Sequence, residues 1–185
     1  MLNIPLLVRE KKKKKILEQD VETSHTPKVR NFMWRACSDI LPTAANLRRQ
    51  RVPVDFTCTI CQQQDETVAH VLWECPLARN VWAGVRGKLQ KCNSEAPNFY
   101  TLARQMEEKL PKKDLEVWAM VSWSIWNARN RFHFEEKQSM PCDILHGVTT
   151  LLQEYQGLCR TSISKSFTIY TVSLFVRVAL FYAQH

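Results

Sequence analysis

Glycine is scarce in this chain, with only four glycines in 185 residues. A protein built from strands needs many tight turns, and glycine is one of the residues that such turns use most. The scarcity therefore argues against an all-β fold. Eight prolines, in contrast, separate stretches of helical periodicity. We expect a mainly α protein.

The chain also lacks the marks of a secreted protein. Its apolar start, MLNIPLLV, carries no charge before it and is followed by a lysine run, which reverses the order of a signal peptide. Seven cysteines, an odd number, suit reduced thiols better than a disulfide framework. We therefore expect an intracellular protein of the nucleus or cytoplasm, in which clustered cysteines bind metal.

Positive charge is concentrated in two places. The formal net charge is +8, yet residues 9–15 alone carry +5 and residues 28–51 another +5, so the remainder is slightly acidic. Local charge of this kind is what a nucleic-acid contact requires, although solubility alone also explains it. The first run, within residues 1–25, reads as a disordered basic tail, either a nuclear-import or phosphate-binding tag or a solvated segment.

Helical periodicity begins after Pro27. Arg30 and Arg35 fall away from most of the apolar stripe of this first helix, and Pro42 ends it. Thr43 is placed to cap a second helix over residues 44–51. The stripe of the first helix consists of Val29, Phe32, Met33, Ala36, Cys37 and Ile40.

Five further helices are expected downstream. The longest, capped by Asp114, has an apolar centre of about a dozen residues, short of the roughly 20 that a bilayer requires. The final stretch, residues 166–185, is apolar but interrupted by Arg177, which argues against a membrane anchor. Its alternating pattern suits a strand. The five expected helices cover residues 66–75, 76–85, 99–110, 114–136 and about 141–158, with a connector over 87–98.

A metal-ligand spacing lies at residues 58–75. Cys58 and Cys61 form a C-x2-C pair, and His70 and Cys75 add H-x4-C, which closes a tetrahedral Cys3His shell. Three thiolates and an imidazole suit Zn2+ better than calcium or magnesium, which prefer oxygen. The alternative is buried cysteines and a core histidine. We interpret the scattered Cys37, Cys92, Cys142 and Cys159 as small apolar residues.

The zinc is expected to be structural. A hydrolytic zinc keeps one coordination position open beside a general base, whereas four protein ligands fill this shell. The deaminase pattern H-x-E…P-C-x-x-C is not matched. A segment of about twenty-five residues would not fold by itself without such an ion.

Two stretches carry a family resemblance: PKVRNFMWRACSDILPTAANLRRQRV and CTICQQQDETVAHVLWECPLARNVW. They resemble the zinc-binding domain that follows the reverse transcriptase in plant non-LTR retrotransposons, through P-K-V-x-x-F-x-W-R, L-P-T-x-x-N-L, C-x2-C and E-T-x-x-H-x-L-x-x-C. WSIWNARNRFHFE resembles the linker helix before an RNase H domain, so the likeness covers about residues 26–157. The resemblance implies zinc at Cys58, Cys61, His70 and Cys75, and a role in holding template nucleic acid.

Catalytic motifs of such polyproteins are missing. The chain has no polymerase aspartate motif, and residues 160–185 contain no Asp or Glu for two-metal RNase H chemistry. We expect no enzyme. Residues 1–25 and about 160–185 resemble nothing in the family, which suggests a genomic fragment or reshaped gene. The expected organisation is a tail (1–25), a zinc-binding domain (26–90), a helical linker region (91–160) and an apolar tail (161–185).

Three functions remain open. The first is sequence-tolerant binding of RNA or DNA, with Trp34 or Trp73 stacking on an unpaired base. The second is a protein-interaction or packing domain that docks on the reverse transcriptase body or self-associates. The third is a functionless remnant. The candidate nucleic-acid-binding residues are Lys28, Arg30, Arg35, Arg48, Arg49 and Arg51.

Overall fold

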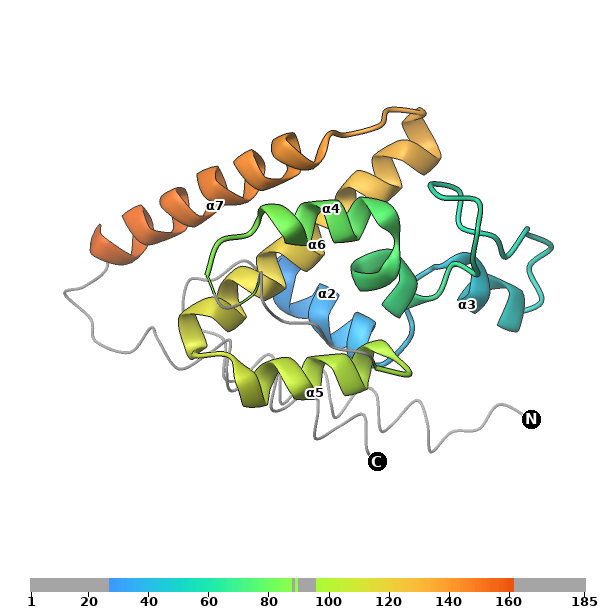
Figure 1. Cartoon of the computed structure of the whole chain (residues 1–185), viewed down its shortest axis with the longest axis horizontal. Coiled ribbons are helices and arrows are strands. Elements are labelled where there is room, and N and C mark those ends of the chain that lie inside the picture. Colours follow the sequence, from blue (N-terminus) through green and yellow to red (C-terminus); the bar gives the residue numbers. More distant parts are fainter. Residues whose placement is uncertain (1–26, 88, 90–95, 162–185) are drawn as a thin grey trace.

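The computed structural model describes residues 27–87, 89 and 96–161 (Figure 1). Within these residues there is no strand, only an isolated antiparallel bridge between Thr57 and Asp65, so the expected mainly α fold is confirmed. The helices are α2 (Pro27–Cys37), α3 (Ala44–Arg49), the π-helical turn η1 (His70–Glu74), α4 (Pro76–Gly84), α5 (Phe99–Lys109), α6 (Lys112–Glu135) and α7 (Pro141–Thr161).

Helix α6 is the centre of the fold. It contacts α2, η1, α5 and α7, while α7 runs back past α6 and also covers α4 (Figure 1). A helix that is enclosed by neighbours on several sides must be apolar on several sides. Accordingly, the buried side chains of α6 include Leu115, Trp118, Val121, Ile125 and Trp126.

One close approach between helices depends on a glycine. A Cβ placed on Gly84, the last residue of α4, would lie 2.6 Å from Cδ1 of Leu145 in α7. Gly147, in the middle of α7, has no such neighbour. The absence of a side chain at Gly84 therefore lets α7 pack closely on α4.

Helix starts agree with the sequence at α3 and differ at α6. The side chain of Thr43 accepts a hydrogen bond from the amide of Asn46 (3.3 Å), as expected of an N-cap. The prediction that Asp114 caps α6 was wrong, because the helix begins at Lys112 and Pro111 takes the cap position. Asp114 lies in the first turn, where its negative charge interacts favourably with the helix dipole.

The end of α2 also differs from the prediction. The apolar stripe predicts a helix through Ile40, but α2 ends at Cys37 and Ile40 is 44% exposed. Asp39 adopts a left-handed φ of 51°. The amide of Ile40 donates to the carbonyl of Arg35 (3.0 Å) and that of Asp39 to Ala36 (3.1 Å), which is the Schellman pattern of a helix C-terminus.

Two expected tails lie outside the described residues, namely the basic segment 1–25 and nearly all of 161–185, and so does Cys92. None of the helices that the structure describes has the length and apolar character to cross a bilayer. The proposed boundary between residues 26–90 and 91–160 stays a prediction. One hydrophobic cluster extends across it, since residues of α2 and α4 pack with residues of α5, α6 and α7.

Candidate metal centre and basic face

The first two candidate ligands lie in a tight loop that begins the knuckle, a name we give to residues 56–75. The bridge between Thr57 and Asp65 closes this loop. Inside it, the amide of Cys58 donates to the carbonyl of Gln64 and the amide of Gln62 donates to the carbonyl of Cys58, each at 2.8 Å. Gln62 takes a left-handed φ of 53°, which turns the chain directly after Cys61. These bonds hold the C-x2-C pair.

The other two ligands flank a π-helical turn. The sequence predicts an α-helix over residues 66–75, but only Val68 and Ala69 are α-helical before η1 begins at His70. In an α-helix of 3.6 residues per turn, positions five apart point about 140° away from each other. The wider turn instead lets the amide of Cys75 donate to the carbonyl of His70 (2.7 Å), which joins the two ligand residues directly.

The four side chains meet at one point. Their ligand atoms all lie within 4.8 Å of one another, and Sγ of Cys61 is 3.3 Å from Nε2 of His70. A tetrahedral zinc with bonds of about 2.3 Å needs ligand atoms roughly 3.8 Å apart. Cys58, His70 and Cys75 are buried and Cys61 is partly buried. The cluster is thus positioned to bind one four-coordinate metal ion.

Gln64 orients the imidazole ligand. Its Oε1 lies 3.1 Å from Nδ1 of His70, and this contact suits the tautomer in which Nδ1–H donates to Gln64 and Nε2 is left to bind a metal ion. A carbonyl or carboxylate that accepts from the distal ring nitrogen is the usual support of a metal-bound histidine. The sequence analysis missed this residue, which lies among three consecutive glutamines.

The four ligand groups shift one another's pKa. The hydrogen bond between the side chains of Cys58 and Cys75, followed by burial, raises the pKa of Cys58 to about 12. The same hydrogen bond lowers the pKa of Cys75. Burial would lower the pKa of His70, but its hydrogen bonds and charge interactions with Cys58 and Cys61 outweigh burial and raise it. Because thiolate and neutral imidazole are the ligating forms, a metal ion must displace these protons.

A buried ion pair ties the knuckle to the helical body. Glu66 and Arg129 have 0% and 4% exposed side chains and are joined twice, by Nη2 to Oε1 and by Nε to Oε2 at 3.2 Å. Oε1 of Glu66 also accepts from the amide of Ala44 at the start of α3 (3.0 Å). The pair therefore connects the knuckle, α3 and α6. Sequence reasoning missed it, because the two residues are 63 positions apart.

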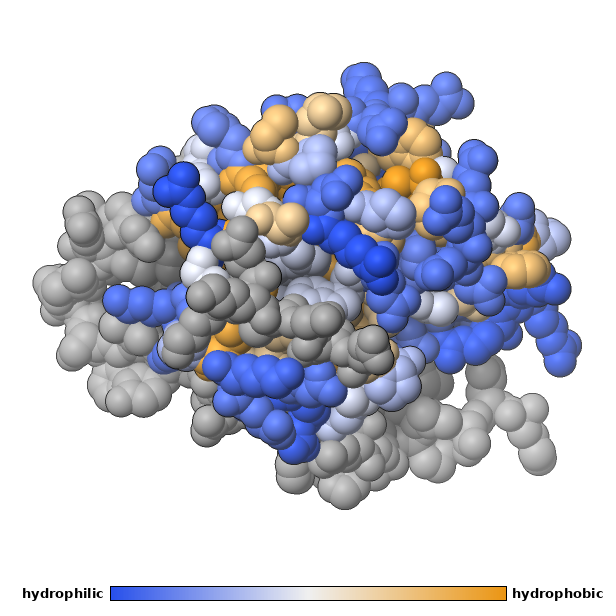
Figure 2. All heavy atoms as spheres, viewed as in Figure 1, coloured by the Kyte–Doolittle hydropathy of each residue, from blue (hydrophilic) through white to orange (hydrophobic). Residues whose placement is uncertain are grey.

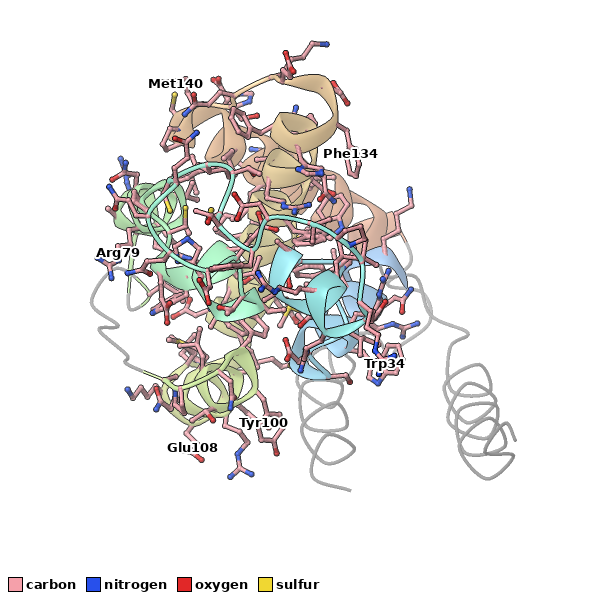
Figure 3. All side chains as sticks on the ribbon, turned by 90° about the vertical axis from the view of Figure 1, so that its right-hand side faces the viewer. Trp34, Arg79, Tyr100, Glu108, Phe134 and Met140 are labelled. Carbon is pink, nitrogen blue, oxygen red and sulfur yellow. The ribbon has the colours of Figure 1, made fainter. Side chains whose placement is uncertain are left out.

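The two tryptophans proposed for base stacking differ. Trp73 is partly buried and lies 5.1 Å from the ring of Trp82, whose indole N–H donates to the carbonyl of Leu72 (2.8 Å). Trp34, a residue of α2, is also partly buried, with its side chain at the surface (Figure 3). Both side chains pack against the core, as core tryptophans do.

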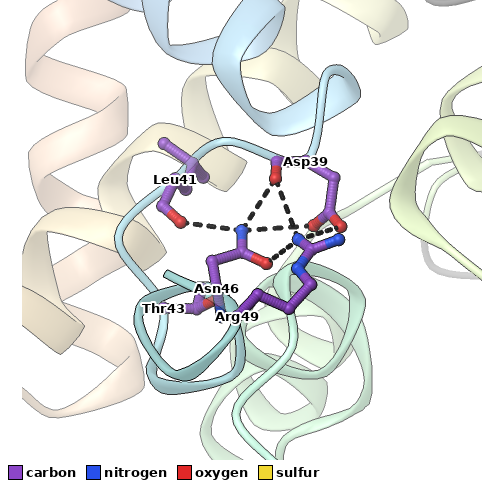
Figure 4. Close-up of polar contacts among 5 residues, drawn as sticks. All are labelled: Asp39, Leu41, Thr43, Asn46 and Arg49. Atoms are coloured by element: carbon purple, nitrogen blue, oxygen red, sulfur yellow. Dashed lines mark hydrogen bonds and ion pairs between the residues drawn. The ribbon is translucent and has the colours of Figure 1, made fainter. Parts of the chain in front are cut away.

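Among the six candidate basic residues, Arg49 is already engaged. Its guanidinium forms an ion pair with Asp39 (2.7 Å) and also contacts Asn46 (Figure 4). The amide nitrogen of Asn46 donates to the carbonyls of Asp39 (2.9 Å) and Leu41 (2.8 Å), so this network fixes α3 against the turn after α2.

The other five candidate basic residues lie on α2, on α3 or directly after α3. Lys28, Arg48 and Arg51 are exposed, while Arg30 and Arg35 are partly buried. Burial lowers the pKa of Arg30. The apolar stripe of α2 from Val29 to Cys37 is buried in the core, whereas Ile40, which follows the end of α2, is exposed. The structure therefore keeps Arg30 and Arg35 off the main apolar face, as the periodicity predicts.

Comparison with known proteins identifies one matching family. Residues 6–82 match the family described as zinc-binding in reverse transcriptase. The match includes all four candidate ligands and begins at residue 6, so the expectation that residues 1–25 resemble nothing in the family was wrong. The resemblance of residues beyond 82 to a linker helix stays a prediction. No curated protein and no solved structure matches the chain significantly.

Proposed function

We propose that this chain is a non-catalytic module of a retroelement reverse transcriptase polyprotein, of the plant non-LTR type, that binds RNA or DNA. Zinc at Cys58, Cys61, His70 and Cys75 stabilises it. Nucleic acid binds to a basic face made of Lys28, Arg30, Arg35, Arg48, Arg49 and Arg51. The matched family is a zinc-binding part of a reverse transcriptase, an enzyme whose other parts handle a nucleic-acid template.

A structural role for the zinc is supported by the closed shell. Three of the four ligand residues are buried, and a tetrahedral ion held by four protein atoms has no position left for water or substrate. Apart from the ion, little apolar burial stabilises the loop of the knuckle, since Cys58 is the only buried residue between positions 56 and 65. The ion therefore acts as a staple rather than as a Lewis acid.

The exposure of Lys28 on α2, of Arg48 on α3 and of Arg51 after α3 carries the nucleic-acid proposal. Residues 44–51 contain three arginines and no acidic residue. Arg48 and Arg51 are exposed there, and Lys28 is exposed at the start of α2. Such side chains can reach phosphates without removing apolar residues from the core. Contacts of this type bind many sequences and weaken with salt.

The proposal is tested by titrating single-stranded RNA and DNA at 50 and 200 mM salt. We expect binding at the lower salt and a marked loss at the higher salt, because phosphate contacts release counterions. Each lost phosphate contact on a single strand lowers the log–log salt slope by about 0.7. The double variant Arg48→Gln/Arg51→Gln should thus lower the slope by about 1.4.

The matched control is Lys113→Gln/Lys137→Gln, which removes the same charge from exposed positions at the two ends of α6. It should leave the slope unchanged. Absence of binding at 50 mM salt contradicts the proposed function. Equal slopes for the two double variants would mean that binding follows net charge and not this face.

One observation favours the protein-interaction alternative. Phe134 and Met140, beside the turn between α6 and α7, are 76% and 59% exposed (Figure 3). Exposed apolar side chains of this size can form part of a protein interface. Sedimentation of the chain and of Phe134→Ser/Met140→Ser over a concentration series tests self-association: a concentration-dependent mass only in the unsubstituted chain would support the alternative.

A further inference from the structure

Exposed apolar side chains occur in the chain segments next to the arginine-rich helix α3. The described residues include five exposed large hydrophobic residues, and three of them precede or follow α3 within seven residues, whereas the other two lie at the α6–α7 turn. In Figure 2 the part of the surface over α3 is mainly hydrophilic with a smaller apolar patch within it. The three flanking residues are Ile40, Val52 and Phe56, which are 44%, 38% and 39% exposed.

Phe56 is the aromatic member of this group and contacts an arginine. The guanidinium carbon of Arg48 lies 4.6 Å from the ring centroid, above its face. The ring does not belong to the hydrophobic core. An aromatic ring layered with a guanidinium offers two flat surfaces, and nucleobases stack on both kinds. The guanidinium edge remains able to donate hydrogen bonds to phosphate.

The backbone under this pair is fixed on both sides. The carbonyl of Phe56 accepts from the amide of Glu66 (2.7 Å), whose carboxylate in turn holds the start of α3 and Arg129. Phe56 also lies two residues before the ligand Cys58. Arg48 projects from α3 itself. The platform is therefore built on the knuckle and on the helix that Glu66 anchors, not on a free loop.

From this geometry we infer that Arg48 and Phe56 form a stacking platform for an unpaired nucleobase, so the chain prefers single-stranded nucleic acid over duplex. This inference rests on the proposed function and adds a class of ligand to it. A base in a duplex is already stacked on both faces and cannot reach the ring unless it leaves the helix. Arg48, Arg49 and Arg51 outnumber the two nearby carboxylates, Asp39, which pairs with Arg49, and Asp55, which interacts with Arg48. The remaining positive charge favours a polyanion over an apolar protein segment.

The discriminating probe is a single strand that lacks bases. We would compare binding of a fluorescent deoxythymidine 12-mer, an abasic 12-mer with the same number of phosphates, and a 12-base-pair duplex, at 50 mM salt. The unsubstituted chain should bind the deoxythymidine strand roughly tenfold more tightly than the abasic strand, which is at the lower end of the effect of one stacked base. It should also prefer that strand to the duplex.

Phe56→Leu keeps an apolar side chain and removes the stacking surface, so it should reduce the tenfold preference to nearly none while binding of the abasic strand stays the same. Phe134→Leu is the matched control, because Phe134 is also an exposed phenylalanine and lies outside the platform, at the C-terminal end of α6. It should keep the full preference. Zinc content and thermal unfolding of both variants show whether each is folded. If the Phe56→Leu protein lacks zinc, Phe56→Tyr is used in its place; it keeps an aromatic face and should therefore keep the preference.

The outcomes separate the two proposals. Equal binding of the base-containing and abasic strands would overturn the platform and leave the proposed function intact. Binding of no probe at 50 mM salt would overturn both. A preference that survives in Phe56→Leu, or disappears equally in Phe134→Leu, would remove Phe56 from the platform.

Discussion

The knuckle loop and the helical body are stabilised in different ways. Between residues 56 and 65 the structure buries only Cys58, whereas α6 alone buries ten residues, Trp118 among them. Apolar burial contributes roughly 25 cal/mol per Å² and so holds the body together. The loop cannot gain much in this way. Its order depends on local hydrogen bonds, on the ion pair of Glu66 and on the metal ligands.

The largest expected effect is therefore confined to the knuckle. Cys58→Ser or His70→Ala should abolish stoichiometric zinc and unfold residues 56–66, because metal binding supplies roughly 10–16 kcal/mol in comparable small zinc sites. The helical signal of α6 and α7 should largely persist. Elemental analysis and amide hydrogen exchange measure the two effects.

The control for this prediction is Cys142→Ser, since Cys142 is an exposed free thiol outside the cluster. It should bind zinc as the unsubstituted chain does. Equal zinc in Cys58→Ser and Cys142→Ser would refute the ligand assignment.

Breaking the link between the two regions should have the next largest effect. Arg129→Met leaves the carboxylate of Glu66 buried without its charge partner, which typically costs about 3–5 kcal/mol of unfolding free energy. Glu66→Gln/Arg129→Met removes both charges and should be less destabilised than Arg129→Met alone. Urea unfolding of both variants measures this; a double variant that is the less stable of the two would contradict it.

The knuckle should also respond to pH where the body does not. Protons and zinc compete for the same ligand atoms. Because the pKa of Cys58 is raised to about 12, its thiol is protonated at neutral pH and zinc binding must release that proton. The pKa of His70 is raised as well, so its imidazole takes up a proton as the pH falls, and zinc must displace that second proton. Affinity for zinc should thus decrease on acidification, by at least tenfold per pH unit.

Competition with a chromophoric chelator between pH 8 and pH 6 measures this affinity, and circular dichroism follows the body in parallel. A zinc affinity that is constant over this range would show that the ligand atoms are not those assigned.

The smallest expected effect lies within the body and increases stability. Gly147→Ala should stabilise α7 by about 0.5–1 kcal/mol, because the added Cβ meets nothing and the unfolded chain loses freedom. Gly84→Ala is the matched comparison and should gain less, since its Cβ would contact Leu145. Thermal unfolding of both variants in saturating zinc ranks them, and a larger gain at Gly84 would contradict the close packing of α4 on α7.

Local features were predictable from the sequence. The spacing of Cys58, Cys61, His70 and Cys75 identifies the cluster because a tetrahedral shell restricts which side chains can reach one ion. Thr43 is recognisable as a cap because the donor it serves lies three residues away. The helix end after Cys37 was not predictable from the apolar stripe, because Asp39 in the left-handed region ends α2 before Ile40.

The amino-acid sequence by itself determined the helical class, the four candidate ligands and the positions of the basic residues, since each depends on neighbours within a few turns of chain. Only the tertiary structure decided that Glu66 pairs with Arg129, that Gln64 orients His70 and that Arg48 covers Phe56. Buried charge, imidazole tautomer and ring contact depend on which groups folding brings together. No local pattern of residues records that.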